Sequence, residues 1–155
     1  MKIARLECEQ FLGVPNGAYS FLAANRLVPN ELTVVAGMRG SGKTRLLDAI
    51  VALKELVGAY RAPPPLSDLL AVGARTGKVQ GKFLLSDEEK NVAQLVSNEL
   101  TVEVGFGEAV PEMSKVSVAV CKLFSRYDHD PSRGKLEYFP SSRTLPPFGE
   151  PTTVT

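Results

Sequence analysis

The feature that most constrains this chain is the glycine-rich stretch Gly37-Met38-Arg39-Gly40-Ser41-Gly42-Lys43-Thr44. It fits the pattern G-x-x-x-x-G-K-[ST] at every fixed position. Glycines let the backbone take positive φ and approach a phosphate without a Cβ in the way. Successive N–H groups at the start of a helix then form an anion-binding nest. The stretch therefore predicts a loop that holds phosphate groups between a strand and a helix.

The residues on both sides of this loop agree with that interpretation. Residues 32–36 (Leu-Thr-Val-Val-Ala) form a short β-branched run, typical of a central strand buried on both faces. Residues 43–60 predict a helix, because apolar side chains recur three or four positions apart, at Leu46, Leu47, Ile50, Leu53, Leu56 and Val57. The alternative is a glycine-rich turn that happens to carry Lys-Thr, and the strand–loop–helix context favours the phosphate loop.

Each residue type in the loop has a chemical task. The ammonium of Lys43 would lie between the β- and γ-phosphates, and the hydroxyl of Thr44 would bind the Mg²⁺ that bridges them. Arg39 either reaches a γ-phosphate or a neighbouring subunit's nucleotide, or is a solvated side chain at the loop tip. The candidate site therefore has Lys43 as catalytic residue and Thr44 as Mg²⁺ ligand. Its candidate nucleotide-binding residues are Gly37, Arg39, Gly40, Ser41, Gly42, Lys43, Thr44 and Arg45.

Composition and charge describe an ordinary folded domain. The chain has 155 residues, of which 44% are apolar and 23% charged, enough for a buried core. Eighteen Lys and Arg against 17 Asp and Glu give a net charge of +1, which excludes a strongly charged tail but not a local basic patch. Cys8 and Cys121 form no C-x-x-C pair, and no apolar run approaches the ~18 residues of a membrane span. With no signal peptide either, we expect a cytoplasmic chain without membrane contact.

Periodicity predicts the other elements. Strands are expected over residues 2–11, 18–23, 100–106, 116–127 and 135–139, and helices over 67–72 and 86–96. Residues 73–81 are predicted to be a loop, because glycines stand at both ends. We expect residues 1–143 to form one lobe and residues 144–155 to be a proline-rich linker or a truncated end.

Several stretches together resemble the amino-terminal lobe of an SMC/RecF-type ATPase, in the ABC-like branch of P-loop proteins often called AAA family ATPases in bacteria. The similar stretches are Met1–Leu6, Phe11, Leu32–Gly37, Gly40–Thr44 and Leu46–Ile50, and Tyr138–Arg143 looks like the strand that closes this lobe. The resemblance implies an α/β fold whose mixed sheet has an antiparallel portion beside the P-loop strand and its helix. It also implies ATP and Mg²⁺ as cofactors, homodimerisation of heads, and a role in DNA repair, chromosome organisation or antiviral defence. DNA is a further candidate partner, although no basic stripe stands out.

Other parts of the family's site are missing from this sequence. Residues 9–12 (Glu-Gln-Phe-Leu) stand where many members have Asn-Phe followed by Arg or Lys. The Ser- and Gly-rich signature loop and the Walker B strand, with its Asp and catalytic Glu, are not found. We therefore expect ATP hydrolysis to require a carboxy-terminal lobe, on a longer chain or on a separate subunit.

Residues 83–89 allow two interpretations. An acidic pair after apolar residues imitates Walker B, but Ser86-x-x-Glu89 is also a capping box, with Asp87 and Glu88 at the positive end of the helix dipole. The cap accounts for every residue of the stretch and is favoured. The other candidates have structural interpretations: His129 in a turn, Cys8 and Cys121 as buried hydrophobes on strands, Tyr138 and Phe139 in the core, and Arg143 at the nucleotide, a partner or the surface.

Two further functions are compatible with a phosphate loop. A small P-loop kinase or nucleotidyl enzyme would need a phosphoryl-acceptor site and a basic lid, and the sequence shows neither an Arg-rich lid nor a catalytic Asp after a strand. A non-catalytic nucleotide-sensing or scaffolding subunit needs the same loop as the ATPase, so the residues alone leave these two open.

Overall fold

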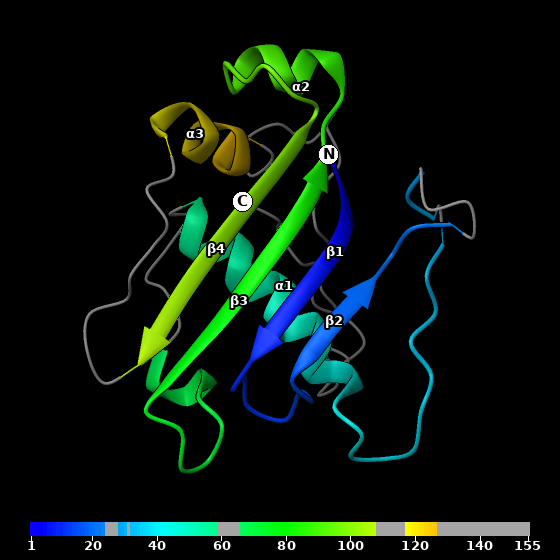
Figure 1. The fold of residues 1–155 in the computed structure, drawn as a ribbon, viewed down its shortest axis with the longest axis vertical. Coiled ribbons are helices and arrows are strands. Elements are labelled where there is room, and N and C mark those ends of the chain that lie inside the picture. The colour runs from blue at the N-terminus through cyan, green and yellow to red at the C-terminus, as the bar shows by residue number, and fades with distance from the viewer. Residues whose placement is uncertain (24–27, 31, 59–65, 108–116, 127–155) are drawn as a thin grey trace, which may run out of the picture.

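The computed structural model describes residues 1–23, 28–30, 32–58, 66–107 and 117–126. Its strands form one four-stranded sheet in the order β2-β1-β3-β4, and every neighbouring pair is antiparallel (Figure 1). The predicted α/β class is confirmed, but within these residues the sheet is antiparallel throughout and not mixed. The elements in chain order are β1 (Lys2–Glu9), β2 (Gly17–Ser20), α1 (Lys43–Val57), the 3₁₀-helix η1 (Leu66–Leu69), β3 (Thr76–Leu84), α2 (Asp87–Val92), β4 (Glu99–Gly107) and α3 (Val118–Arg126).

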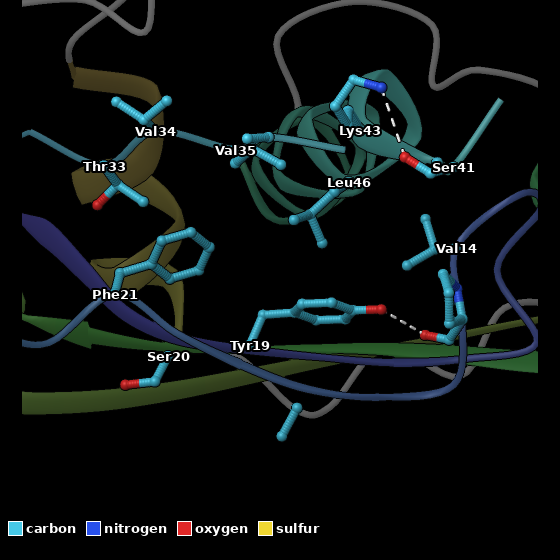
Figure 2. A pocket seen from close by; sticks show the side chains of 14 residues that line it. Val14, Tyr19, Ser20, Phe21, Thr33, Val34, Val35, Ser41, Lys43 and Leu46 are labelled. Atoms are coloured by element: carbon cyan, nitrogen blue, oxygen red, sulfur yellow. Dashed lines mark hydrogen bonds between the residues drawn. The ribbon is translucent and has the colours of Figure 1, made fainter. Parts of the chain in front are cut away.

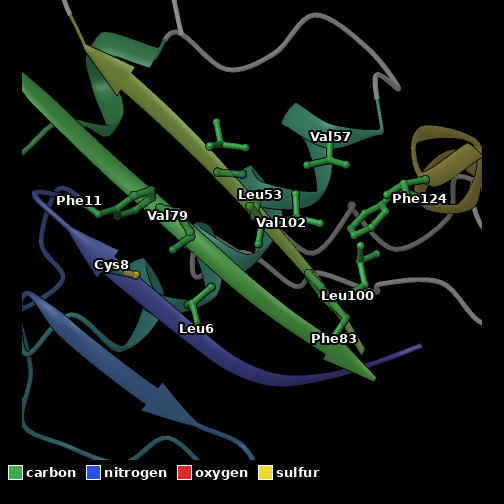
Figure 3. Packing of buried hydrophobic residues seen from close by; sticks show 14 of the residues in the cluster. Leu6, Cys8, Phe11, Leu53, Val57, Val79, Phe83, Leu100, Val102 and Phe124 are labelled. Atoms are coloured by element: carbon green, nitrogen blue, oxygen red, sulfur yellow. The ribbon is translucent and has the colours of Figure 1, made fainter. Parts of the chain in front are cut away.

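Helix α1 crosses one face of the sheet, and the core lies between the two (Figures 1 and 3). Strand β1 alternates as predicted, so that Leu6 and Cys8 are buried while Arg5 and Glu9 are exposed. Leu53 of α1 is fully buried in the same cluster. The structure therefore confirms the strands predicted over residues 2–11, 18–23 and 100–106 and the helix predicted over 43–60. All of these elements are shorter than predicted except the strand over 100–106.

Strand β3 occupies most of the segment predicted to be a loop, so that prediction is wrong. Its glycines allow close packing and do not make a turn: a Cβ added at Gly77 would lie 2.6 Å from the Phe106 ring. A Cβ at Gly81 would overlap with the side chain of Leu53, which comes from α1. Glycine in a strand often marks such a close approach.

Residues 118–126 form helix α3, and the strand predicted over 116–127 is wrong. The buried side chains are Val120, Leu123 and Phe124, at the spacing i, i+3, i+4 of a helix face. Phe124 meets Phe83 edge-to-face, with ring centroids 5.3 Å apart. Cys121 therefore lies half-buried on a helix and not on a strand.

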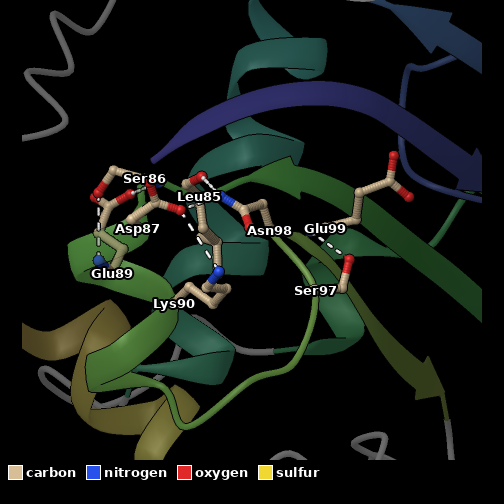
Figure 4. A network of polar contacts seen from close by, with 8 residues as sticks. All are labelled: Leu85, Ser86, Asp87, Glu89, Lys90, Ser97, Asn98 and Glu99. Atoms are coloured by element: carbon tan, nitrogen blue, oxygen red, sulfur yellow. Dashed lines mark hydrogen bonds and ion pairs between the residues drawn. The ribbon is translucent and has the colours of Figure 1, made fainter.

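Helix α2 begins with the predicted capping box (Figure 4). The Glu89 N–H donates to Ser86 Oγ at 3.3 Å, and the Ser86 N–H donates to the Glu89 carboxylate at 2.8 Å. Asp87 accepts a hydrogen bond from Asn98 and forms an ion pair with Lys90. Both contacts lower the pKa of the Asp87 carboxyl, and the hydrogen bond from Asn98 has the larger effect. The helix ends at Val92, earlier than predicted. Because α2 lies at the end of the sheet opposite to the start of α1, Asp87 and Glu88 act at their own helix and not at the glycine-rich loop (Figure 1).

The helix predicted over 67–72 is only a short 3₁₀ turn, η1. Among the described residues, no helix is long and apolar enough to cross a membrane. The predictions for His129, Tyr138, Phe139, Arg143, the strand over 135–139 and the linker over 144–155 fall outside the described residues.

Candidate functional site

The glycine-rich loop ends at the first residue of α1, where the motif requires it. Gly40 and Gly42 have φ of 81° and 86°, in the left-handed region that favours glycine. Gly37 does not have positive φ, but a Cβ there would lie 2.7 Å from Ser41 Oγ, so this position too has no room for a larger residue. The backbone therefore has the tight turn that the sequence predicts.

The amino terminus of α1 carries neither a side-chain cap nor an acidic residue in its first turn. Helix α2 is the opposite case, with Ser86 as cap and Asp87, Glu88 and Glu89 in its first turn. The first N–H groups of a helix have no intrahelical acceptor, and the helix dipole makes that end positive. The N–H groups at the start of α1 thus have no side-chain cap, and they can donate hydrogen bonds to an anion at the positive end of the helix dipole.

Lys43 is held against the loop by its own side chain. Its Nζ donates to the carbonyl oxygens of Gly37 at 2.9 Å and Met38 at 2.6 Å. It also lies 3.4 Å from Ser41 Oγ, as Figure 2 shows. The ammonium is therefore fixed beside the N–H groups that would contact a phosphate. These features fit a nucleoside triphosphate, whose negative phosphates the Lys43 ammonium would face.

Thr44 follows in the first turn of α1 and is exposed. Among the described residues there is no cluster of three or more His, Cys, Asp or Glu that could hold a metal ion. The Thr44 hydroxyl is the side-chain group of the loop that could bind a magnesium ion together with phosphate oxygens, and this role stays a prediction.

The two arginines of the candidate site differ in surroundings. Arg39 is exposed in the turn at the loop tip. Arg45 is on α1, and its guanidinium donates to Asp48 at 3.3 Å. Its aliphatic stem lies beside the β1–β2 turn, since a Cβ added at Gly13 would be 3.0 Å from Arg45 Cγ. The role of both residues at a nucleotide stays a prediction.

The β1–β2 turn also touches the loop itself, a contact that the sequence reasoning missed. A Cβ added at Gly42 would overlap with the carbonyl oxygen of Gly13 and lie 3.7 Å from Pro15 Cδ. Residues 14–17 could be recognised as a turn, but no local pattern shows which distant residue a turn packs against. The turn braces the last glycine of the loop.

The strand predicted over Leu32–Ala36 is wrong for the described part of the chain. The segment has no regular secondary structure and pairs with no described strand, and Leu32 and Val34 are 79% and 77% exposed. The β-branched run suits a strand, but strand formation also needs a neighbouring strand with which to pair. The chain thus presents an apolar, unpaired segment directly before the loop.

A pocket of about 510 Å³ lies between this segment, the loop and strand β2 (Figure 2). Ser41, Gly42 and Lys43 form the part of its wall that belongs to the loop. The pocket's other residues come from separate parts of the chain, so no local pattern predicts that they line one pocket. The remaining lining residues are Val14, Pro15, Ala18, Tyr19, Ser20, Phe21, Thr33, Val34, Val35, Ala36 and Leu46.

The fold is similar to a solved structure from work on the structural biochemistry of ATP-driven dimerization and DNA-stimulated activation of SMC ATPases. The match has a TM-score of 0.54 and 19% sequence identity, and covers 83% of this chain and 78% of that one. No protein-family model and no curated protein matches the sequence. The chain thus shares the overall α/β fold of that solved structure, which agrees with the fold class that the sequence resemblance implies but not with its mixed sheet.

Proposed function

We propose that this chain binds ATP with Mg²⁺ at the loop Gly37–Thr44 and forms the first lobe of an SMC/RecF-like ATPase head. The observation that carries the proposal is the start of α1. There an uncapped helix terminus, two glycines with positive φ and a lysine folded over the loop come together. The SMC ATPase-like fold supports the same conclusion.

In this proposal each group has one task. The N–H groups from Gly40 to Thr44 hold the β-phosphate, and Lys43 neutralises charge between the β- and γ-phosphates. Bound Mg²⁺ would neutralise further phosphate charge, with the Thr44 hydroxyl among its ligands. Arg39 and Arg45 are the further cations close enough in sequence to contribute.

Hydrolysis in this proposal needs a second, carboxy-terminal lobe, in the same longer chain or in a separate subunit. The segment Leu32–Ala36 supports this, because it has no described strand partner and exposes the apolar side chains of Leu32 and Val34. A strand of the second lobe that paired with it would bury Leu32 and Val34. It would also bring catalytic carboxylates to the loop from outside the described residues.

Head dimerisation and DNA are proposed as further partners on the strength of the SMC ATPase neighbour, whose own work concerns ATP-driven dimerization and DNA stimulation. The exposed face of the sheet does not add to the case for DNA. There Lys82 pairs with Glu99 at 2.7 Å, and Lys78 pairs with Glu9 and Glu103. A cytoplasmic location is also proposed, since Cys8 and Cys121 are free thiols, as a reducing compartment favours.

Titration of a fluorescent ATP analogue into two variants tests the nucleotide site. Lys43→Ala should weaken binding about ten- to a hundred-fold with or without Mg²⁺, because a charge-assisted phosphate contact is worth roughly 1.5–3 kcal/mol. Thr44→Ala should weaken binding only when Mg²⁺ is present, and its defect should shrink in EDTA. Lys54→Ala, which removes the same charge from the last turn of α1, is the matched control and should bind like the wild type. Wild-type affinity in all variants would mean that Gly37–Thr44 is an ordinary turn.

Hydrolysis is tested separately. The isolated chain should bind ATP without steady turnover, since the catalytic acid is expected from the second lobe. Steady hydrolysis that is lost in Lys43→Ala would show that the acid lies within these 155 residues. A chain that binds ATP but stays inactive with its second lobe added would instead be a nucleotide-sensing or scaffolding subunit.

A further inference from the structure

The turn between β1 and β2 lies beside the start of α1, where the phosphate loop ends (Figure 1). The carbonyl oxygen of Gly13 occupies the space that a side chain at position 42 would need, because a Cβ added at Gly42 would overlap with it. Gly42 is the N-cap of α1, and its φ of 86° belongs to the tight turn that leads into the helix. The position of the β1–β2 turn therefore bears on the N–H groups that would contact a phosphate.

The turn begins at a strained residue, Gln10. Its φ of 52° lies in the left-handed region, which a residue other than glycine adopts only where the surrounding structure supports it. Both backbone groups of Gln10 have such support. The Gln10 N–H donates to Asn16 Oδ1 at 2.7 Å, and the Gln10 carbonyl accepts from the Ala71 N–H at 2.8 Å. These two hydrogen bonds hold the strained conformation in place.

The two supports of Gln10 differ in kind. On the side of η1 the support comes from the backbone, and there the Leu12 N–H also donates to the Leu69 carbonyl at 2.8 Å. On the other side the support comes from the side chain of Asn16, which closes residues 10–16 into a compact turn. Asn16 is exposed, so its replacement leaves no cavity in the core. Loss of its amide would loosen the turn while the backbone contacts with η1 remain.

We propose that Asn16 is a positioning residue of the phosphate loop. By holding Gln10 in its left-handed conformation, Asn16 keeps the Gly13 carbonyl against Gly42 and raises the fraction of molecules whose loop can bind phosphates. The inference rests on the proposed function, since it concerns phosphate binding at Gly37–Thr44. It extends that function by making the affinity depend on a side chain that acts through the turn and not on the ligand.

The size of the effect follows from the strain. The left-handed conformation costs a residue with a side chain about as much as one hydrogen bond contributes, so without Asn16 the turn loses much of its preference for the braced form. The apparent affinity falls with the fraction of molecules that are competent to bind. Asn16→Ala should therefore weaken binding by about three- to ten-fold. The loss should be equal for ATP and for inorganic tripolyphosphate, because Asn16 acts on the loop that both ligands share.

Calorimetric titration of ATP and of tripolyphosphate, each with Mg²⁺, tests the inference in the wild type and three variants, with folding checked by circular dichroism. Asn16→Ala should show the equal losses. The double variant Gln10→Gly/Asn16→Ala should recover both affinities to within about two-fold of the wild type, because glycine adopts positive φ without strain. Asn98→Ala is the matched control: it removes the same exposed amide, which donates to the Leu85 carbonyl at 3.2 Å, at the opposite end of the sheet (Figure 4). It should lower the urea midpoint and leave both affinities unchanged.

Amide hydrogen exchange gives a second measurement, on the wild type alone. Because coupling between two equilibria is reciprocal, ATP with Mg²⁺ should slow exchange of the Gln10 amide, which donates to Asn16. The Ser86 amide also donates to a side-chain oxygen, but it lies at the start of α2. Its exchange should be the same with and without ATP.

The outcomes separate this inference from the proposed function. Unchanged affinities in Asn16→Ala would overturn the inference and leave the phosphate site standing. A loss for ATP but not for tripolyphosphate would also overturn it, because Asn16 would then act on another part of the ligand. Equal losses in Asn16→Ala and Asn98→Ala, or no recovery in the double variant, would show that Asn16 contributes only to general stability. If the wild type bound neither ligand, the proposed function would fail and the inference with it.

Discussion

Replacing Gly42 by alanine tests whether the β1–β2 turn braces the phosphate loop. At φ 86° an alanine costs about 1–2 kcal/mol, because its Cβ crowds its own backbone in the left-handed region. The new Cβ would also overlap with the Gly13 carbonyl oxygen, so the turn must move by about 1 Å to restore ordinary contact. Overpacking of this kind adds about 1–3 kcal/mol. The sum, about 2–5 kcal/mol, is a large part of the ~5–15 kcal/mol that stabilises a typical domain.

Gly40→Ala is the matched control for this substitution. Gly40 lies in the same loop with a nearly equal φ of 81°, but no atom lies within 4 Å of a Cβ added there. It should therefore cost only the conformational strain, about 1–2 kcal/mol. The difference between the two variants isolates the contact with the turn.

Urea denaturation followed by circular dichroism measures both costs. For an m-value of about 2 kcal/mol per molar urea, Gly42→Ala should lower the midpoint by roughly 0.5–1.5 M more than Gly40→Ala does, with similar slopes. Equal midpoint shifts in the two variants would refute the bracing contact. If Gly40→Ala lowered the urea midpoint as much as an overpacked residue does, the argument that a Cβ at Gly40 meets no other atom would be refuted.

Three further predictions concern the rest of the fold. Ser86→Ala should lower the free energy of unfolding by about 1 kcal/mol, because it removes the cap of α2, and an unchanged urea midpoint would contradict the capping box. Leu123→Ala should cost about 2–5 kcal/mol by leaving a cavity under α3, whereas a loss under 1 kcal/mol would mean that α3 docks loosely. Burial raises the pKa of Glu89, but its hydrogen bonds with the chain's terminal ammonium and Ser86 outweigh this and lower it overall. The ionised Glu89 carboxylate therefore stabilises the fold above the ordinary glutamate pKa of 4.5, and this stabilisation is lost as the pH falls through the lower pKa of the folded state. Glu89→Gln should flatten the acid side of a plot of urea midpoint against pH. An unchanged plot would argue against this role of Glu89.

Local patterns were enough where one segment decides its own structure. The amphipathic spacing from Leu46 to Val57 predicted α1, and Ser86-x-x-Glu89 predicted the start of α2. The glycine-rich loop was found in the same way, since its spacing is itself the requirement for a turn before a helix. In these cases the hydrogen bonds that matter join residues only a few positions apart.

The failed predictions all depended on distant neighbours. The glycines of β3 led to the prediction of a loop, although they lie in a strand where Leu53 and Phe106 of other elements pack too closely for a side chain. The 118–126 segment carries β-formers such as Val118 and Val120, but its packing against Phe83 selects a helix. For Leu32–Ala36 the apolar pattern predicted a strand, but no described strand pairs with the segment. The pocket lined by Tyr19 could not be predicted for the same reason.

Amide chemical-shift mapping on uniformly ¹⁵N-labelled protein tests the central claim most directly. Addition of ATP with Mg²⁺ should shift the amide resonances of Gly40, Ser41, Gly42, Lys43 and Thr44 most, because these N–H groups at the start of α1 contact the phosphates. The amides around the capped start of α2, from Ser86 to Glu89, should stay nearly unmoved and serve as the internal control. Saturable shifts centred on residues 40–44 are the result that the account predicts. An absence of shifts there, or shifts centred on α2, would contradict it.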